Sequence, residues 1–210
     1  IWPTGILKLL NVKYLLLPHN PNNNYQNDFF NLKATNSSMY YFGNHPMYDG
    51  KLISVDVIEF KESLTRLFFP KNIVKVSDKN KIFDLITNDS FDPIEISYFH
   101  SLQLGGSKSF ANDNPTVRIE EWSPNEIHFT TNTLSEHFLV MSEIYFPYGW
   151  NLSDGYNNYS IHEVNNLVRG FYVPVGTTSF VMKFNPNDVI WGNRFSILSL
   201  ILILLTFIYI

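Results

Sequence analysis

The chain contains no cysteine, and only 16% of its 210 residues are charged. The absence of cysteine excludes disulfide bonds and thiolate metal sites, although it does not assign the protein to a compartment. The formal net charge is −4 at pH 7, and Lys and Arg form no clustered stripe. Because nucleic-acid backbones are bound by clustered cations, we do not expect a nucleic-acid partner.

The sequence also lacks the familiar catalytic and metal-binding motifs. Its six histidines form no HExxH motif, so no metal site is predicted. Ser142 lacks the flanking glycines of a nucleophile elbow, and the GGSK segment at 105–108 lacks the earlier glycine of a phosphate-binding loop. Glu120 and Glu121 are adjacent in a predicted strand and would point to opposite faces. No catalytic residue is therefore predicted, which counts against a membrane-tethered hydrolase.

Apolar and aromatic residues are abundant instead. Hydrophobic residues make up 45% of the chain, with 18 Phe, 12 Tyr and 4 Trp. This composition is sufficient for a packed core and favours strands. From Thr116 onward, runs of strand length alternate with turn residues, and within 126–131 apolar and polar residues alternate. The sequence predicts a mainly β fold with an antiparallel, jelly-roll-like β-sandwich at 116–187.

Glycines mark two turns within this predicted sandwich. Asp154-Gly155 indicates a tight turn, and Gly176 lies in the turn of a final hairpin.

The first half of the chain predicts a small α/β segment at 1–103. The apolar run Leu9–Leu17 predicts an entry strand buried on both faces, with the foot of a membrane helix as the alternative. Ser77 precedes apolar residues at helical spacing, which predicts one short helix that ends before Pro93. The following stretch, 104–115, is predicted to be a linker.

The C-terminal tail, 194–210, consists almost entirely of Ile, Leu and Phe after its first residue. It predicts a transmembrane helix, and because it is shorter than the roughly 20 apolar residues that cross a bilayer, we expect it to be truncated. The chain begins with Ile1 rather than Met. We therefore expect part of a longer membrane protein, with membrane lipid as a partner and a soluble domain beside the bilayer.

Five residues of the predicted sandwich are candidates for a binding site or for its structural core. Glu143 and Arg169 interrupt apolar strands, where an isolated charge is costly, so they either pair inside the sandwich or serve a ligand. Backbone carbonyls are the other partners open to Arg169. As ligand-binding groups, Glu143 would bind a sugar hydroxyl and Arg169 a sugar phosphate. Tyr145 and Trp150 either pack in the core or stack on a sugar. Asn165 is predicted to fix a turn through its side chain.

Several segments resemble the YfhO family of bacterial membrane proteins. They are SEIYFPYGWNLSDG (142–155), VNNLVRGFYVPVG (164–176) and KFNP (183–186), with LLNVKYLLLP near the start and the segment 66–93. Two features depart from the family pattern, namely the extra Tyr148 before Gly149 and an uncharged hairpin sequence, YNNYS, after Gly155. The second departure indicates that a surface contact made by charged residues in relatives would be lost.

The resemblance implies a function in the cell envelope. It implies the extracytoplasmic C-terminal domain of a multi-span protein similar to polyprenyl-phosphate-sugar-dependent glycosyltransferases of GT-C-like architecture. Such proteins modify polymers such as lipoteichoic acid. The resemblance places the catalytic carboxylate upstream of this chain, so we expect no cofactor here, although a lipid-linked sugar phosphate would be the donor for the complete protein. The alternative is a membrane-anchored β-sandwich that serves as a structural or binding module without enzymatic activity.

Overall fold

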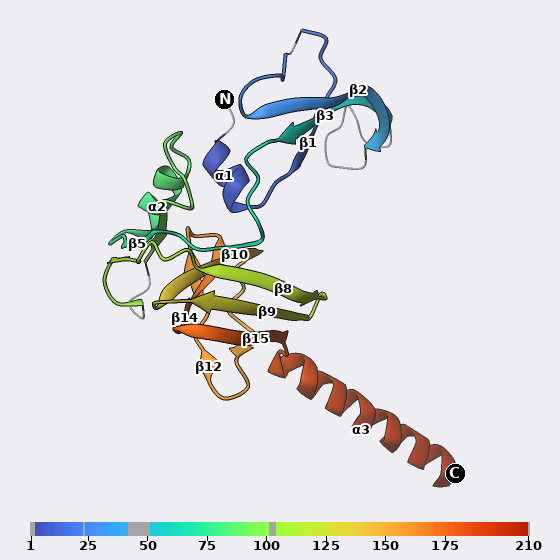
Figure 1. Cartoon of the computed structure of the whole chain (residues 1–210). Coiled ribbons are helices and arrows are strands. Elements are labelled where there is room, and N and C mark those ends of the chain that lie inside the picture. The colour runs from blue at the N-terminus through green and yellow to red at the C-terminus, as the bar shows by residue number, and fades with distance from the viewer. Residues whose placement is uncertain (1–2, 23, 42–50, 101–103, 210) are drawn as a thin grey trace.

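The computed structural model describes residues 3–22, 24–41, 51–100 and 104–209. Strands dominate, and the predicted fold class is confirmed: a mainly β chain with antiparallel sheets and a C-terminal apolar helix (Figure 1). In chain order the elements are α1 (Thr4–Leu9), β1 (Tyr14–Pro18), β2 (Phe30–Tyr41), β3 (Lys51–Phe60), β4 (Leu67–Phe68), β5 (Asn72–Lys75), α2 (Lys79–Ile86), β6 (Ile96–Phe99), β7 (Lys108–Ser109), β8 (Thr116–Trp122), β9 (Glu126–Thr133), β10 (His137–Ile144), β11 (Trp150–Ser153), β12 (Asn158–Tyr159), β13 (His162–Val164), β14 (Val168–Val173), β15 (Gly176–Phe184) and α3 (Asn187–Tyr209).

Two antiparallel sheets form the sandwich. One has the strand order β13-β14-β10-β4 and the other the order β12-β11-β15-β9-β8. The predicted alternation in β9 is confirmed, because Ile127 and Phe129 are buried, whereas Glu126, His128 and Thr130 are only half-buried. The side chains that fill the space between the sheets are Leu67, Ile127, Phe129, Leu139, Met141, Leu152, Phe171, Val173, Phe180 and Met182.

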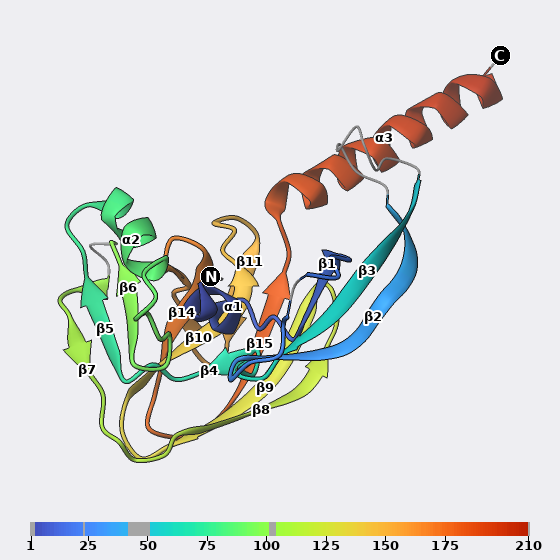
Figure 2. The same ribbon diagram turned by 90° about the horizontal axis from the view of Figure 1, so that it is seen from above.

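The four-stranded sheet is buried on both of its faces. Along β10, Leu139 and Met141 enter the core of the sandwich, whereas Phe138 and Val140 enter a second core on the opposite face. This explains the continuous apolar sequence of β10, because a strand covered on both sides needs no polar face. The second core lies against the unit built from β5, α2 and β6, so this part of the molecule has three layers (Figure 2).

The three-stranded β6-β5-β7 sheet forms the outer layer. β5 and β6 are parallel and are connected through α2, and β7 pairs antiparallel with β5. The cap of α2 is Asp78 rather than the predicted Ser77, and the Asp78 carboxylate accepts a hydrogen bond from the Asn80 amide at 3.0 Å. The segment 104–115 contains β7, and its first residue, Leu104, is buried in the second core. β4, from the range 1–103, joins the sandwich through β10.

The predicted entry strand at Leu9–Leu17 is wrong in its first half. Leu9 ends helix α1, and β1 begins only at Tyr14. Between them Asn11 has a left-handed backbone with φ 53°, which ends the helix and redirects the chain. β1 alternates exposed and half-buried residues, so it is not buried on both faces. It forms a separate antiparallel sheet of order β1-β3-β2.

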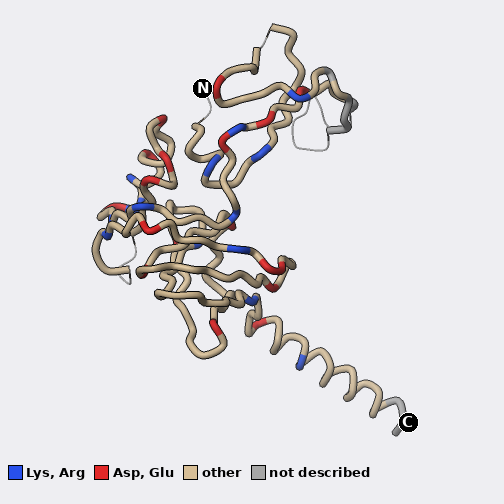
Figure 3. Tube along the Cα trace, viewed as in Figure 1, with Lys and Arg blue, Asp and Glu red and all other residues tan. Residues whose placement is uncertain are grey.

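The C-terminal helix α3 leaves the body of the molecule directly after β15 (Figures 1 and 2). It begins at Asn187, earlier than the predicted residue 194. Its segment Asn187–Thr206 is long and apolar enough to cross a membrane, and none of that segment is buried against the rest of the chain. Charged residues occur only near its beginning, at Asp188 and Arg194 (Figure 3).

Candidate functional site

The open edge of the sandwich carries a groove. The edge strands of the two sheets are β12 and β13, and the chain crosses from one sheet to the other between them at Ser160 and Ile161. Three adjoining cavities surround this crossing, with volumes of about 250, 210 and 470 Å³. Tyr145 lines the first two cavities, and residues of 158–162 line all three. We call them together the edge groove.

Five aromatic side chains line the edge groove: Tyr145, Phe146, Trp150, Tyr159 and Tyr172. The Tyr159 ring is fixed at both ends, since its hydroxyl donates to Asp154 at 2.7 Å and its ring contacts Phe180 edge-on at 5.1 Å. Burial raises the pKa of the Tyr159 and Tyr172 phenols, so both are neutral hydrogen-bond donors at pH 7. The groove therefore presents rigid aromatic surface next to polar groups.

Those polar groups come from the crossing and from the strands on either side of it. The side chains of Asn158, Ser160 and His162 make no hydrogen bond to any residue in the described part of the chain, yet all three line the cavities. Burial lowers the pKa of His162, so its imidazole is neutral at pH 7 and offers one donor and one acceptor. At one end of the groove, Lys79 and Glu163 form an ion pair at 2.7 Å. Neutral donors and acceptors beside aromatic rings suit a polyhydroxylated ligand.

Arg169 supports the groove from inside the sandwich. It projects from β14 into the space between the sheets, and its Cζ lies 4.2 Å from the centre of the Trp150 ring. Its Nε donates to the Ile144 carbonyl at 3.1 Å. The side chain is buried and lines none of the three cavities. Burial lowers the pKa of Arg169 and the charge of Glu143 partly opposes this, but an arginine remains a cation at neutral pH.

Glu143 has a different partner from the one considered in the sequence. Its carboxylate accepts a hydrogen bond from Arg66 at 3.0 Å, and the Arg66 guanidinium lies 4.6 Å from the centre of the Trp122 ring. Glu143 therefore joins the segment before β4 to the sandwich. Arg169 satisfies its own charge through the backbone carbonyl of Ile144 and the face of Trp150.

Asn165 connects the sandwich to the outer sheet. Its amide donates to the Tyr98 carbonyl at 2.7 Å, and its Oδ1 accepts from the Tyr98 amide at 2.7 Å. Its Nδ2 donates to Ser97 Oγ at 3.3 Å. Asn165 is completely buried and has φ 53°, a left-handed conformation that Asn tolerates. Both of these side-chain hydrogen bonds go to a neighbouring strand, β6, rather than to the local turn as predicted.

The two predicted turns contain glycines in left-handed conformations, with φ 90° at Gly155 and 103° at Gly176. In the first turn Asp154 Oδ1 accepts from the amides of Tyr156 at 2.8 Å and Asn157 at 2.6 Å. These hydrogen bonds, with that from Asn157 the strongest influence, hold the pKa of Asp154 far below its usual range. The turn supports Tyr159, and through it the wall of the edge groove.

A part-buried cluster of Asp113, Ser135 and His137 was not predicted from the sequence. His137 Nε2 lies 2.5 Å from Asp113 Oδ1, and Ser135 Oγ donates to Asp113 Oδ2 at 2.8 Å. Ser135 Oγ also lies 3.3 Å from His137 Nε2, the same ring nitrogen that contacts Asp113. A nucleophile relay requires the serine and the aspartate on opposite nitrogens of the imidazole, so this arrangement does not match one. His137 is only 2% exposed. The cluster ties the segment 104–115 to β10, and its members carry no local sequence signal.

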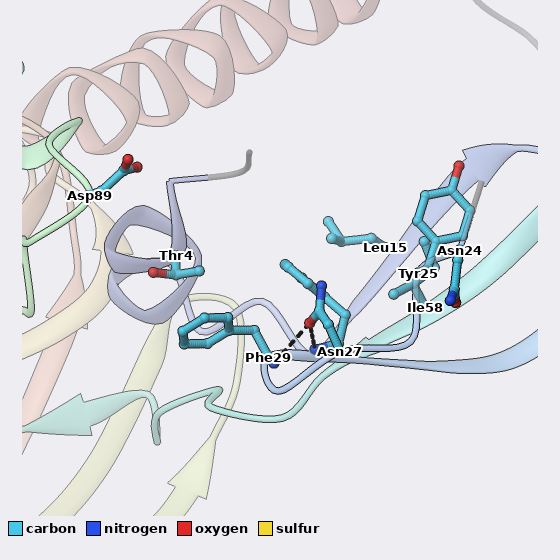
Figure 4. Close-up of a pocket in the computed structure, with 9 residues that line it drawn as sticks. Thr4, Leu15, Asn24, Tyr25, Asn27, Phe29, Ile58 and Asp89 are labelled. Carbon is cyan, nitrogen blue, oxygen red and sulfur yellow. Dashed lines mark hydrogen bonds between the residues drawn. The ribbon is translucent and has the colours of Figure 1, made fainter.

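A separate cavity of about 360 Å³, more apolar than the edge groove, lies at the N-terminal sheet (Figure 4). Leu15, Phe29 and Ile58 contribute apolar walls, and Thr4 and Asp89 lie at one side. The Asn27 Oδ1 at this cavity already accepts from the amides of Phe29 and Phe30, both at 2.9 Å. Asn24 Oδ1 likewise accepts from the Gln26 amide at 3.0 Å, so two polar side chains of this cavity are already occupied by the backbone. For the residues that the structure describes, no group of three or more His, Asp or Glu could hold a metal ion at either site.

Comparison with known proteins finds no matching family model, no matching curated protein and no matching solved structure. The edge groove and helix α3 are therefore the features that bear on function.

Proposed function

We propose that this chain is the extracytoplasmic, membrane-anchored part of a cell-envelope protein, and that its edge groove binds the sugar residues of an envelope polymer. The observation that carries the proposal is the juxtaposition of the Tyr145 and Trp150 rings with the unpaired side chains of Asn158, Ser160 and His162. Sugar rings present apolar C–H faces and hydroxyl groups at their rims. Aromatic surface beside neutral donors and acceptors complements both features.

The position of the groove supports a polymer attached to the membrane. Trp150, which lines the groove, pairs with Phe184 of β15, and α3 begins three residues later. The groove therefore opens near the base of the helix that is long and apolar enough to cross a membrane. A lipid-anchored polymer such as lipoteichoic acid would reach the groove from the same membrane.

Within this proposal, the complete protein is a glycosyltransferase that uses a polyprenyl-phosphate sugar, as the resemblance to the YfhO family implies. The groove would then hold the acceptor polymer, while the chemistry is carried out by other parts of the protein. The alternative is a binding module with no transferase attached, for which the groove has the same role.

Binding of purified lipoteichoic acid to the chain in lipid nanodiscs tests the groove. We expect Tyr145→Ala to weaken binding by roughly tenfold, in line with the value of one aromatic contact. Tyr156→Ala is the matched control, because Tyr156 is 96% exposed and lines none of the three cavities. Failure of the parent chain to bind, or equal loss in both variants, would reject a polymer site at the groove.

The same two variants in the complete protein separate the transferase from the binding module. If the transferase proposal is correct, Tyr145→Ala lowers glycosylation of the envelope polymer and Tyr156→Ala does not. Weakened binding with unchanged glycosylation would favour the binding module.

A further inference from the structure

The loop between β10 and β11 is fixed against the base of helix α3. Gly149 O accepts a hydrogen bond from the Asn185 amide at 2.6 Å. Gly149 has φ 84°, and a Cβ at this position would lie 2.8 Å from the Phe184 ring and 2.9 Å from Pro186. Only glycine combines this backbone conformation with so close an approach. The loop therefore has a defined position directly before Asn187, where α3 begins.

Two aromatic side chains of this loop project into solvent. Phe146 is 51% exposed and Tyr148 is 71% exposed, and their rings contact each other edge-on at 5.9 Å. Phe146 also lies beside Phe184, with ring centres 6.4 Å apart. Two large rings held together at the surface are costly in water and indicate a contact with another apolar phase.

The first turns of α3 carry a further exposed aromatic side chain. Trp191 is 54% exposed and lies one helical turn from the start of the helix, about 6 Å along its axis. Arg194 stacks on it, with its Cζ 5.0 Å from the centre of the Trp191 ring. Tryptophan and tyrosine are enriched at the boundary between lipid and water, where arginine also reaches toward the headgroups.

We propose that Phe146 and Tyr148 insert into the headgroup region of the bilayer that α3 crosses, and so form a second membrane contact of the soluble domain. The inference rests on the membrane anchoring in the proposed function. The candidate span begins at Asn187, and a headgroup layer is roughly 5–8 Å thick. A loop that contacts residues 184–186 lies within that layer. The contact would fix the orientation of the domain and hold the edge groove, which Phe146 also lines, close to the lipid surface.

Site-directed fluorescence tests this contact, and the absence of cysteine from the chain makes each label unique. Phe146→Cys and Tyr148→Cys would each carry an environment-sensitive fluorophore, in nanodiscs of phosphatidylcholine and phosphatidylglycerol with nitroxides on the headgroup or the acyl chain. We expect a blue shift of emission and quenching by headgroup and shallow nitroxides at both positions. Leu134→Cys is the matched control, because Leu134 is 78% exposed but lies far from α3. It follows Thr133, which pairs with Gly176 at the start of β15, whereas α3 follows the other end of that strand.

Leu202→Cys, within α3, separates failure of this inference from failure of membrane anchoring. Quenching at Leu202 by deep nitroxides, together with no more quenching at 146 and 148 than at 134, would overturn the inference and leave the anchor intact. Absence of quenching at Leu202 would reject the anchor itself. Thermal unfolding of each variant verifies its fold, and since Tyr148 is the more exposed position, Tyr148→Cys carries the test if Phe146→Cys is misfolded.

Discussion

The Arg169 guanidinium lies between the two sheets with its Cζ 4.2 Å from the centre of the Trp150 ring, and its Nε donates to the Ile144 carbonyl. A buried arginine is thus satisfied by an aromatic face and a backbone carbonyl, and a side chain of the core supports a ring of the edge groove.

Replacement of Arg169 by lysine should destabilise the protein by about 1–3 kcal/mol, because an ammonium group cannot both stack flat on the indole and retain the Nε hydrogen bond. Chemical denaturation measures the loss. A double-mutant cycle with Trp150→Phe should give a coupling of about 0.5–2 kcal/mol. Strict additivity of the two substitutions would show that the stacking contributes nothing.

Gly170 occupies a space that admits no side chain. A Cβ there would lie 2.4 Å from the Phe138 ring and 2.6 Å from Val164. We expect Gly170→Ala to cost about 1–3 kcal/mol of unfolding free energy through overpacking of the second core. Gly106→Ala is the control, because a Cβ at Gly106 meets no atom within 4 Å. Equal stability of the two variants would contradict the packing shown by the structure.

Asn165 combines a left-handed backbone with a buried hydrogen bond, and two substitutions separate these contributions. Asn165→Gly keeps the backbone conformation but leaves the Tyr98 amide without its partner, at a cost of about 1–3 kcal/mol. Asn165→Ala should cost about 1–2 kcal/mol more because of the φ of 53°. Asn114→Gly, at an exposed position with the same φ, should leave stability nearly unchanged. If Gly at 165 were equally harmless, the link to β6 would not contribute to stability.

His162 should make stability depend on pH below its ordinary pKa of 6.5. Burial lowers its pKa in the folded state, so as pH falls below 6.5 the unfolded chain gains a proton that the folded chain does not. The stability associated with the neutral imidazole is therefore complete above pH 6.5 and is lost as pH falls toward the folded pKa. Thermal melts should show that the melting temperature falls less steeply with decreasing pH below 6.5 for His162→Gln than for the parent chain. An unchanged slope would assign the pH dependence to other groups.

Local patterns were sufficient for much of the fold. The alternation in β9, the glycine turns at 155 and 176 and the apolar sequence of α3 all appear where the sequence indicated. Tyr145 and Trp150 were also identified from their residue types as binding or core residues, and both line the edge groove. Each of these features depends on neighbouring residues, whose spacing is visible in the sequence.

Other features depend on contacts between distant residues. The apolar run Leu9–Leu17 is divided at Asn11, whose backbone is left-handed. The run itself does not show this break, because the short helix that ends at Leu9 is stabilised by packing of Leu9 in the second core. The choice of Arg66 as the partner of Glu143 joins residues 77 positions apart.

The sequence by itself determined the class of fold, the position of the apolar helix and the residue types available for a site, because hydrophobic periodicity and turn chemistry act over a few residues. The tertiary structure alone decided which side chains pair and where a groove opens. Asn158, Ser160 and His162 line the groove only because the chain crosses between two sheet edges at that point. The loop between β10 and β11 lies beside the start of α3 only because Gly149 permits its close approach to Phe184.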